Sequence, residues 1–522
     1  MRWLSRANDI DCLKLIWCVY SLQSGNERAA ARYIDFPRAA VTKSPEEPNS
    51  IYKWELETIT TLLLTTPKDR EREGKYHFTN LTHFGSMGSA IAYLRKVEGA
   101  EYAFTSVPER IFEELYRIGQ RQFSWQRGYN RENLYRFAYV YGQGECGDFF
   151  QETHGLTVAD FMMMSFILFG MMHTYAWMNI PDVATLGFNP AHMAKTVELH
   201  SLDLADVRRR AVELKRGAVD RLGQPLRTAY QPSVLRERPM ISTNTRGGGI
   251  IAPLPPLVMG RATSGLFYDI RKGPRRLIIE ANARFEEYVR LLIRSYCPRF
   301  VAMGTGSYGT KRHGFETPDI LVRNGQELAV VFECKATKLT FEAQFAENPV
   351  VAAADGFQQM AKGVFQLWRL FSHARRGIYT EYAISADTRG VVLTMDGWMQ
   401  LEAGLRDATM RRARELCGAS DPDITEEDMR IIVFMSVQEL NDVFCETNED
   451  TFLQTLTAAA QPANLGDGII EMARNLKLTG EKRPFPLDMG DVLPWYPDFD
   501  ERCDEYVRRM SRAQERIGGR YP

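Results

Sequence analysis

The chain has 522 residues, of which 44% are hydrophobic and 25% are charged, and its formal net charge at pH 7 is −1. This composition is typical of a soluble protein of two to four domains, and the near-zero charge argues against a protein that coats nucleic acid indiscriminately. The eight cysteines include no C-x-x-C pair and no zinc spacing, which predicts reduced thiols in a cytoplasmic protein.

Residues 1–235 are predicted to be mainly helical, and we expect this region to serve recognition, regulation or oligomerisation. The apolar run at 162–172 is too short to span a bilayer. Thr157-Val-Ala-Asp160 before it resembles a helix N-terminal cap, so we interpret the run as a buried helix and expect no membrane partner. The predicted helices cover residues 9–21, 51–65, 87–96, 108–121, 157–178 and 205–222.

Two stretches of this region could contact nucleic acid. In residues 123–144 aromatic side chains such as Trp125 and Tyr135 alternate with arginines, a pattern that suits base stacking, although helical aromatics are more often core residues. Residues 206–276 contain fifteen Lys or Arg and five Asp or Glu, an excess of ten positive charges. This excess could follow a phosphate backbone or belong to a solvated helix and linker. Residues 236–276 are predicted to be a connector with strand-like pieces.

Residues 317–337 are predicted to form a β-hairpin that gathers charged groups at one end. Residues 319–323 have the pattern of a short strand, Asn324-Gly325 is a strong turn signal, and residues 328–336 return antiparallel. In the second strand Glu333 and Lys335 share one face because side chains alternate. Hairpin closure brings Asp319 near both of them, within a register uncertainty of about two residues.

Two carboxylates and a lysine at one sheet end predict metal-assisted phosphodiester cleavage. Asp319 and Glu333 supply the hard oxygen ligands that suit Mg²⁺, and the backbone carbonyl of Cys334 could add another. Lys335 would orient or deprotonate the attacking water, or neutralise charge that develops on the phosphate. A surface salt bridge at a strand end is the alternative interpretation.

Pro318-Asp319 followed by Glu333-Cys334-Lys335 resembles the signature of the PD-(D/E)XK nuclease superfamily, over residues 280–400. This resemblance implies a restriction-endonuclease-like mixed sheet flanked by helices, Mg²⁺-dependent cleavage of DNA or less often RNA, with Mn²⁺ as a possible substitute, and catalytic roles for Asp319, Glu333 and Lys335. It also implies a preceding helix with a further carboxylate. The helix predicted at 280–295 offers Glu286, which borders its apolar face, whereas the neighbouring Glu287 lies on a more solvated stripe.

Substrate-binding candidates lie on both sides of the motif. The helix predicted at 355–371 presents a polar stripe that includes Gln359, Lys362 and Gln366, and in similar nucleases such residues lie near the metal or phosphate; a solvated helix face is the alternative. Gly304-Thr-Gly306-Ser-Tyr-Gly309 matches G-x-G-x-x-G but does not link a strand to a helix. We expect a flexible loop there, from which Lys311 and Arg312 could touch phosphate.

The predicted fold is therefore a multidomain α+β protein. A mostly helical N-terminal half precedes a nuclease core at residues 277–400 and an α/β extension with a helical tail at 401–522. Residues 380–398 are predicted to contribute two strands and residues 431–436 a further strand. A Mg²⁺-dependent endonuclease of genome defence, restriction or repair would suit this architecture by family analogy, with a homo-oligomer or partner protein providing recognition or activation. An inactive nuclease-like scaffold is the alternative.

Overall fold

The protein is an α+β protein with a mostly helical N-terminal half and a later mixed five-stranded sheet flanked by helices, as predicted. We call Met1–Thr105, Gln122–Pro274 and Asp488–Pro522 the helical unit, and Ser106–Arg121 and Arg275–Leu487 the sheet unit, because each forms a compact body. The computed structural model describes every residue except 1, 43, 70–79, 106–110, 127–129, 244–248, 312, 337, 339, 347–348, 353, 398–402, 500 and 502–522.

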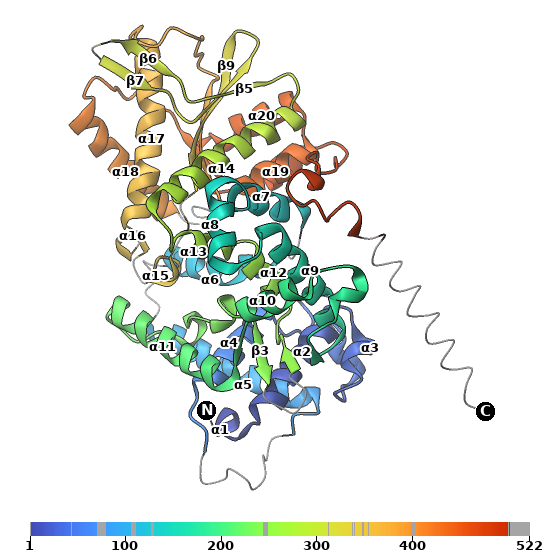
Figure 1. Ribbon diagram of the computed structural model, residues 1–522. Helices are drawn as coiled ribbons and strands as arrows, with labels where there is room; N and C mark the ends of the chain where they lie inside the picture. The colour runs from blue at the N-terminus through green and yellow to red at the C-terminus, as the bar shows by residue number, and fades with distance from the viewer. Residues whose placement is uncertain are drawn as a thin grey trace. The chain divides into compact units, whose positions relative to one another are not determined.

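The helical unit packs its helices around buried aliphatic and aromatic side chains and carries one small sheet (Figure 1). The sheet has the strand order β1-β4-β3-β2. Its strands are β1 (Met178–Asn179), β2 (Ser201–Asp203), β3 (Met240–Thr243) and β4 (Gly249–Ile251). The helices are α1 (Arg2–Arg6), α2 (Asp9–Gln23), α3 (Glu27–Ala30), α4 (Lys53–Thr65), α5 (Phe84–Thr105), α7 (Arg131–Tyr141), α8 (Gly144–His154), α9 (Val158–Thr174), α10 (Pro190–His200), α11 (Leu204–Leu222), α12 (Pro256–Ala262) and α13 (Leu266–Ile270).

The apolar run at 162–172 lies in α9 and is mostly buried, which confirms the prediction of a buried helix. The Thr157 hydroxyl caps this helix by accepting a hydrogen bond from the Asp160 backbone N–H at 3.0 Å. Within the described part of the chain no single helix is long and apolar enough to cross a membrane, and α8 and α9 meet that test only as a pair bent by 64°. Trp125 and Tyr135 are also buried, so these two rings belong to the core and are not available for base stacking.

The sheet unit is built on the strand order β11-β10-β9-β8-β5. β9 pairs antiparallel with β8 and parallel with β10, and β10 pairs parallel with β11. The two strands predicted at 380–398 are reduced to β10, because Ala383 forms only a single bridge to Glu327. The strands are β5 (Val301–Gly304), β8 (Ile320–Asn324), β9 (Glu327–Lys335), β10 (Arg389–Thr394) and β11 (Ile432–Ser436).

Parallel strands need long crossover connections, and helices supply them here. α17 connects β9 to β10 and α18 connects β10 to β11; Figure 1 shows both on one side of the sheet, with α19 and α20 on the other. α17 shares one apolar core with Val331 and Val392 of the sheet. The helices of this unit are α14 (Arg275–Tyr296), α15 (Phe341–Phe345), α16 (Pro349–Ala352), α17 (Ala354–Arg375), α18 (Ala403–Ser420), α19 (Val437–Glu446), α20 (Glu449–Ala459) and α21 (Ile469–Asn475), and α6 (Ile111–Gln126) contains the boundary between the units.

The glycine-rich segment before Asp319 forms a second hairpin, so the expectation of a flexible loop was wrong. β6 (Ser307–Thr310) pairs antiparallel with β7 (His313–Glu316). At the hairpin base the Thr317 backbone N–H donates to the Gly306 carbonyl at 2.8 Å, and the Gly306 N–H donates to the Thr317 hydroxyl at 2.9 Å. The glycines thus connect strands, which agrees with rejecting a dinucleotide-binding fingerprint.

Candidate active site

The β8–β9 hairpin brings Asp319 and Glu333 to the same end of the sheet. Ile320 of β8 lies opposite Phe332 of β9, and one further step in the same register places Asp319 opposite Glu333. Opposite residues of an antiparallel pair share a face of the sheet, so both carboxylates start from the same face. The sequence therefore predicted the meeting of these two residues to within its stated register uncertainty.

The turn that closes this hairpin forms one residue later than predicted. Asn324 is still paired with Glu327, so Gly325 and Gln326 are the turn residues. Gly325 has φ of 66°, a left-handed conformation that glycine adopts at no steric cost. The Asn-Gly signal located the hairpin correctly, while the register shift between Val322 and Arg323 decided which two residues form the turn.

Asp319 is tied to the second strand by a short hydrogen bond. The Cys334 backbone N–H donates to Asp319 Oδ2 at 2.7 Å. The N–H and C=O of one residue point toward the same side of a strand, so the Cys334 carbonyl is directed to the side from which Asp319 approaches. Burial raises the pKa of Asp319, against the lowering effects of Lys335 and the Cys334 N–H. Cys334 can therefore contribute through its backbone, while its thiol is buried.

Glu333 and Lys335 form a buried ion pair. Lys335 Nζ lies 2.6 Å from Glu333 Oε1, and the two side chains are 13% and 1% exposed. Glu333 Oε2 is buried without a hydrogen-bond partner among the described residues. Burial raises the pKa of Glu333 to about 8, although Lys335 acts to lower it. Burial would lower the pKa of Lys335, but Glu333 and Asp319 outweigh this effect and raise it, so the lysine is charged at neutral pH.

Glu286 on α14 belongs to the same electrostatic cluster. Burial and the nearby Asp319 carboxylate raise the pKa of Glu286 to about 7, while Arg290 and Lys335 act to lower it. Its side chain is half-buried, whereas Glu287 is exposed. Glu286 is therefore close enough to Asp319 and Lys335 for their charges to act on its pKa.

α17 passes close to the charged pair at a glycine. A Cβ atom at Gly363 would lie 3.0 Å from Glu333 Cγ and 3.2 Å from Lys335 Cε. Gln359 is four residues before Gly363 and Gln366 is three residues after it. Viewed down the helix axis, both side chains therefore point within about 60° of the direction in which a Gly363 side chain would point. Both side chains are half-buried, whereas Lys362 is exposed. The two glutamines therefore border the face of α17 that covers the pair, and Lys362 is turned further away.

Lys311 and Arg312 were the predicted phosphate contacts on the β6–β7 hairpin. Lys311 is exposed at the tip between β6 and β7, and the exposed His313 lies close to it in sequence. Arg312 lies outside the described residues. Lys311 therefore remains a candidate for phosphate contact on exposure alone.

The donor set fits a hard divalent cation better than a soft one. Among the described residues no three His, Cys, Asp or Glu side chains are grouped to hold a metal ion, so the two carboxylates would need water or substrate oxygens to complete a site. Mg²⁺ is commonly bound by one or two carboxylates together with water and substrate phosphate. Asp319, Glu333 and the Cys334 carbonyl meet this requirement, and the unpartnered Oε2 of Glu333 is a buried acceptor that a cation would satisfy.

Sequence reasoning missed a second polar cluster, in which Tyr308 and Asp421 bond to opposite nitrogens of His373. One signal was present: His373 follows Gln366 by seven residues and so continues the polar stripe of α17.

Comparisons of the chain with protein-family models, with curated proteins and with solved structures found no match.

The raised pKa of Glu333 predicts a pH-dependent free energy of unfolding. The Glu333 carboxyl group binds its proton more tightly in the folded state than in the unfolded chain, where the pKa of a glutamate is near 4.5. The contribution of Glu333 to stability therefore falls as the pH rises from about 4.5 to about 8. Lys335 contributes no slope there, because its raised pKa lies above 10.5. In EDTA, we expect the stability of Glu333→Gln relative to wild type to increase by about 2–4 kcal/mol from pH 5 to pH 8.

Urea unfolding at several pH values measures this difference. Subtracting the two curves removes the contribution of buried histidines such as His200, whose lowered pKa produces the opposite slope. Exposed Glu327 is the matched control, and Glu327→Gln should run parallel to wild type. A Glu333→Gln curve that also runs parallel would contradict the raised pKa.

The close approach at Gly363 predicts that Gly363→Ala disturbs the charged pair. The added methyl group must displace Glu333 or Lys335 by a few tenths of an ångström, and small displacements of reacting groups have large kinetic effects. We expect about tenfold slower metal-dependent cleavage, with a small change in stability because alanine favours the helix by about 1 kcal/mol. Gly418→Ala in α18, where a Cβ meets nothing within 4 Å, is the control and should cleave normally. Equal rates for both variants would show that the pair tolerates the methyl group.

Proposed function

We propose that this protein is a Mg²⁺-dependent nuclease with a restriction-endonuclease-like core that hydrolyses phosphodiester bonds, with DNA favoured over RNA. The observation that carries the proposal is the Glu333 carboxylate. It is buried next to Asp319 and Lys335, and its Oε2 has no partner among the described residues. Leaving a carboxylate oxygen in that state is costly, whereas a cation would stabilise it. The comparisons neither support nor oppose this proposal, since they found no relative.

Asp319, Glu333 and the Cys334 carbonyl would hold the ion, and Mn²⁺ can substitute for Mg²⁺. When bound, the ion polarises the phosphate and activates water. The charged Lys335 ammonium would neutralise charge developing on the phosphate. Glu286, with a pKa of about 7, would be about half ionised at neutral pH and thus suited to accept a proton from the attacking water.

The substrate backbone would contact three side chains of α17. The half-buried Gln359 and Gln366 would donate hydrogen bonds, and the exposed Lys362 would supply a positive charge. Lys311 on the β6–β7 hairpin would add a second point of contact. The helical unit would then serve recognition, activation or assembly, in a role such as genome defence, restriction or repair. These assignments follow the family analogy together with the positions of the side chains.

A catalytically silent scaffold is the second candidate. The contact between Glu333 and Lys335 favours it, because Lys335 Nζ lies 2.6 Å from Glu333 Oε1 without a metal. Such a protein would bind nucleic acid or a protein partner through a nuclease-like fold. The presence of all three motif residues favours the enzyme.

The two candidates are distinguished by incubating the purified protein with plasmid, linear and single-stranded DNA and with RNA, in Mg²⁺, Mn²⁺ or EDTA. The nuclease proposal expects cleavage with either metal and none in EDTA. Loss of cleavage in Asp319→Ala and Lys335→Ala ties the activity to this site. Binding without cleavage under all conditions would favour the scaffold, and cleavage that persists in EDTA would contradict the metal-dependent mechanism.

A further inference from the structure

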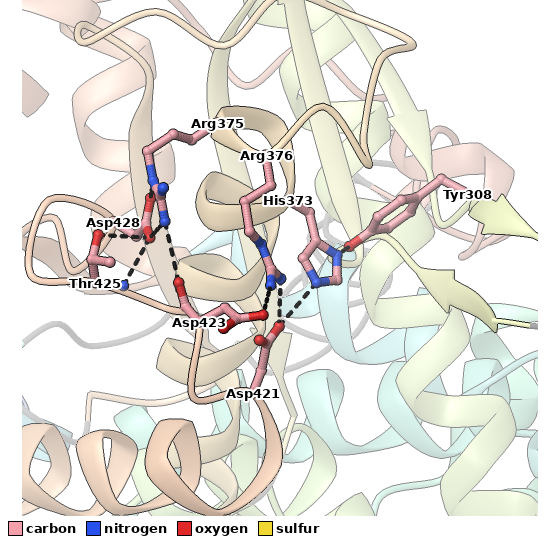
Figure 2. Close-up of polar contacts among 8 residues, drawn as sticks. All are labelled: Tyr308, His373, Arg375, Arg376, Asp421, Asp423, Thr425 and Asp428. Carbon is pink, nitrogen blue, oxygen red and sulfur yellow. Dashed lines mark hydrogen bonds and ion pairs between the residues drawn. The ribbon is translucent and has the colours of Figure 1, made fainter.

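A partly buried network of hydrogen bonds links the β6–β7 hairpin to α17 and to the segment after α18. Tyr308 Oη lies 2.9 Å from His373 Nδ1, and His373 Nε2 lies 3.0 Å from Asp421 Oδ2. Figure 2 shows the three side chains in line, with Arg376 reaching Asp421 and Asp423 from the end of α17. The nuclease mechanism proposed above does not use any of these residues.

The chemistry of the groups sets the direction of these hydrogen bonds. An ionised Asp421 can only accept, so His373 donates to it through Nε2–H. Burial lowers the pKa of His373, and Arg376 acts in the same direction against Asp421. The lowered pKa favours the neutral ring, whose Nδ1 accepts a hydrogen bond from the Tyr308 hydroxyl. Both ring nitrogens of His373 therefore have a hydrogen-bond partner.

Tyr308 and Phe315 attach the hairpin to α17. They lie opposite each other in the β6–β7 pair and are half-buried, whereas the other described residues of the two strands are exposed. The Phe315 ring packs on His373 with a centroid distance of 4.4 Å, and Arg369 lies over Phe315 at 5.8 Å. An isolated two-stranded hairpin is at best marginally stable. The position of this hairpin therefore depends on these contacts.

The hairpin starts beside Asp319 and packs against the C-terminal part of α17. Its base is closed by hydrogen bonds between Gly306 and Thr317, two residues before Asp319. Its side covers Arg369 and His373, which continue the stripe of Gln359, Lys362 and Gln366 toward the C-terminal end of α17. In the first part of the stripe Lys362 is exposed and the two glutamines are half-buried, and Lys311 is exposed at the hairpin tip.

We propose that the β6–β7 hairpin is a DNA-backbone-binding arm that acts through Lys311, and that the hydrogen bond from Tyr308 to His373 holds the arm in place. This inference rests on the proposed function, because it takes duplex DNA as the substrate. Lys311 would touch phosphate directly. Tyr308 and His373 are positioning residues: they touch no substrate and act by fixing where Lys311 stands.

The test compares Tyr308→Phe, Lys311→Ala and the double variant. Tyr308→Phe keeps the ring and removes only the hydroxyl. The matched control is Tyr379→Phe, because Tyr379 packs on Tyr308 at 5.2 Å while its own hydroxyl has no hydrogen-bond partner among the described residues. DNA binding is measured by fluorescence anisotropy with a labelled duplex in EDTA, so that cleavage plays no part. Hydrogen exchange of the β6 and β7 amides measures whether the arm is docked.

We expect Tyr308→Phe to weaken DNA binding and to speed amide exchange in the hairpin by about three- to tenfold each, the effect of one lost hydrogen bond. Lys311→Ala should weaken binding and reduce the slope of log K against log salt by about 1. Binding by the double variant should match that of Lys311→Ala, because the tyrosine acts through the lysine. Tyr379→Phe should behave as wild type.

Hairpin exchange at the wild-type rate in Tyr308→Phe would overturn the positioning role. Binding effects that add in the double variant would overturn the path through Lys311. If wild type cleaves DNA and all variants bind DNA as tightly as wild type, the proposal of a DNA-binding hairpin is overturned and the nuclease proposal stands. If wild type neither binds nor cleaves DNA, both proposals are overturned.

Discussion

Asp319→Asn is expected to slow metal-dependent cleavage by about 10²–10⁴-fold, which corresponds to the loss of about 3–5 kcal/mol of transition-state stabilisation. The asparagine oxygen can still accept the Cys334 N–H, so the hairpin should keep its geometry. The variant loses the negative charge that a hard cation requires. Because burial raises the pKa of Asp319, removing that charge should leave the free energy of unfolding unchanged or slightly increased.

The measurement is a single-turnover cleavage rate in Mg²⁺ together with urea unfolding. Asp387→Asn is the matched control: it removes the same charge in the same unit, from a side chain that is 94% exposed. We expect the control to cleave as wild type. Comparable activity in Asp319→Asn and wild type would remove Asp319 from the site.

Mg²⁺ binding is expected to tighten by about 10–100-fold from pH 6 to pH 8. Without metal, the pKa of Glu333 is about 8 and that of Glu286 about 7, both raised mainly by burial. At pH 6 both carboxyl groups are therefore largely protonated, and a cation that binds there must displace their protons. Each displaced proton makes affinity rise up to tenfold per pH unit below the pKa of its group.

Calorimetric titration of Mg²⁺ in two buffers of different ionisation enthalpy measures both the affinity and the protons released. We expect about one proton released at pH 7, mainly from Glu333. Glu333→Gln should lose most of the affinity and most of the pH dependence, while Glu327→Gln, on an exposed carboxylate of the same strand, should keep both. An affinity that does not change with pH would contradict a metal site at Glu333.

Local sequence signals predicted the β8–β9 hairpin and the convergence of its charged residues. Strand alternation placed Glu333 and Lys335 on one face, and the Asn-Gly signal brought Asp319 opposite Glu333 because both strands are short and adjacent in sequence. The helix that carries Glu286 follows from apolar periodicity in the same way. Such predictions succeed where the partners are separated by a single turn or lie on one regular element.

Features that depend on distant contacts were not predictable in this way. Tyr308 meets His373 across 65 residues and His373 meets Asp421 across 48, and no local pattern links these positions. The β6–β7 hairpin was interpreted as a loop because its glycines mask a strand pattern. Its order comes from Tyr308 and Phe315 packing on α17, a tertiary effect. The second strand expected within 380–398 did not form for a related reason: outside β10, the described residues of this segment make only the single bridge from Ala383 to Glu327.

The close approach of α17 to the charged pair lies between these cases. Gly363 was visible as a costly residue inside a predicted helix, which indicates close packing. What it packs against is Glu333 and Lys335, and this follows only from the crossover between β9 and β10. The crossover therefore determines which face of α17 covers the candidate site.

We propose that Asp319 and Glu333 hold a divalent cation, and anomalous diffraction can locate such an ion. Crystals of the protein soaked in millimolar MnCl₂ would be measured near the manganese absorption edge. We predict an anomalous peak bonded to oxygens of Asp319 and Glu333 at about 2.0–2.2 Å, with the Cys334 carbonyl on the same ion. No peak between these two carboxylates at a manganese concentration that supports DNA cleavage would contradict the claim.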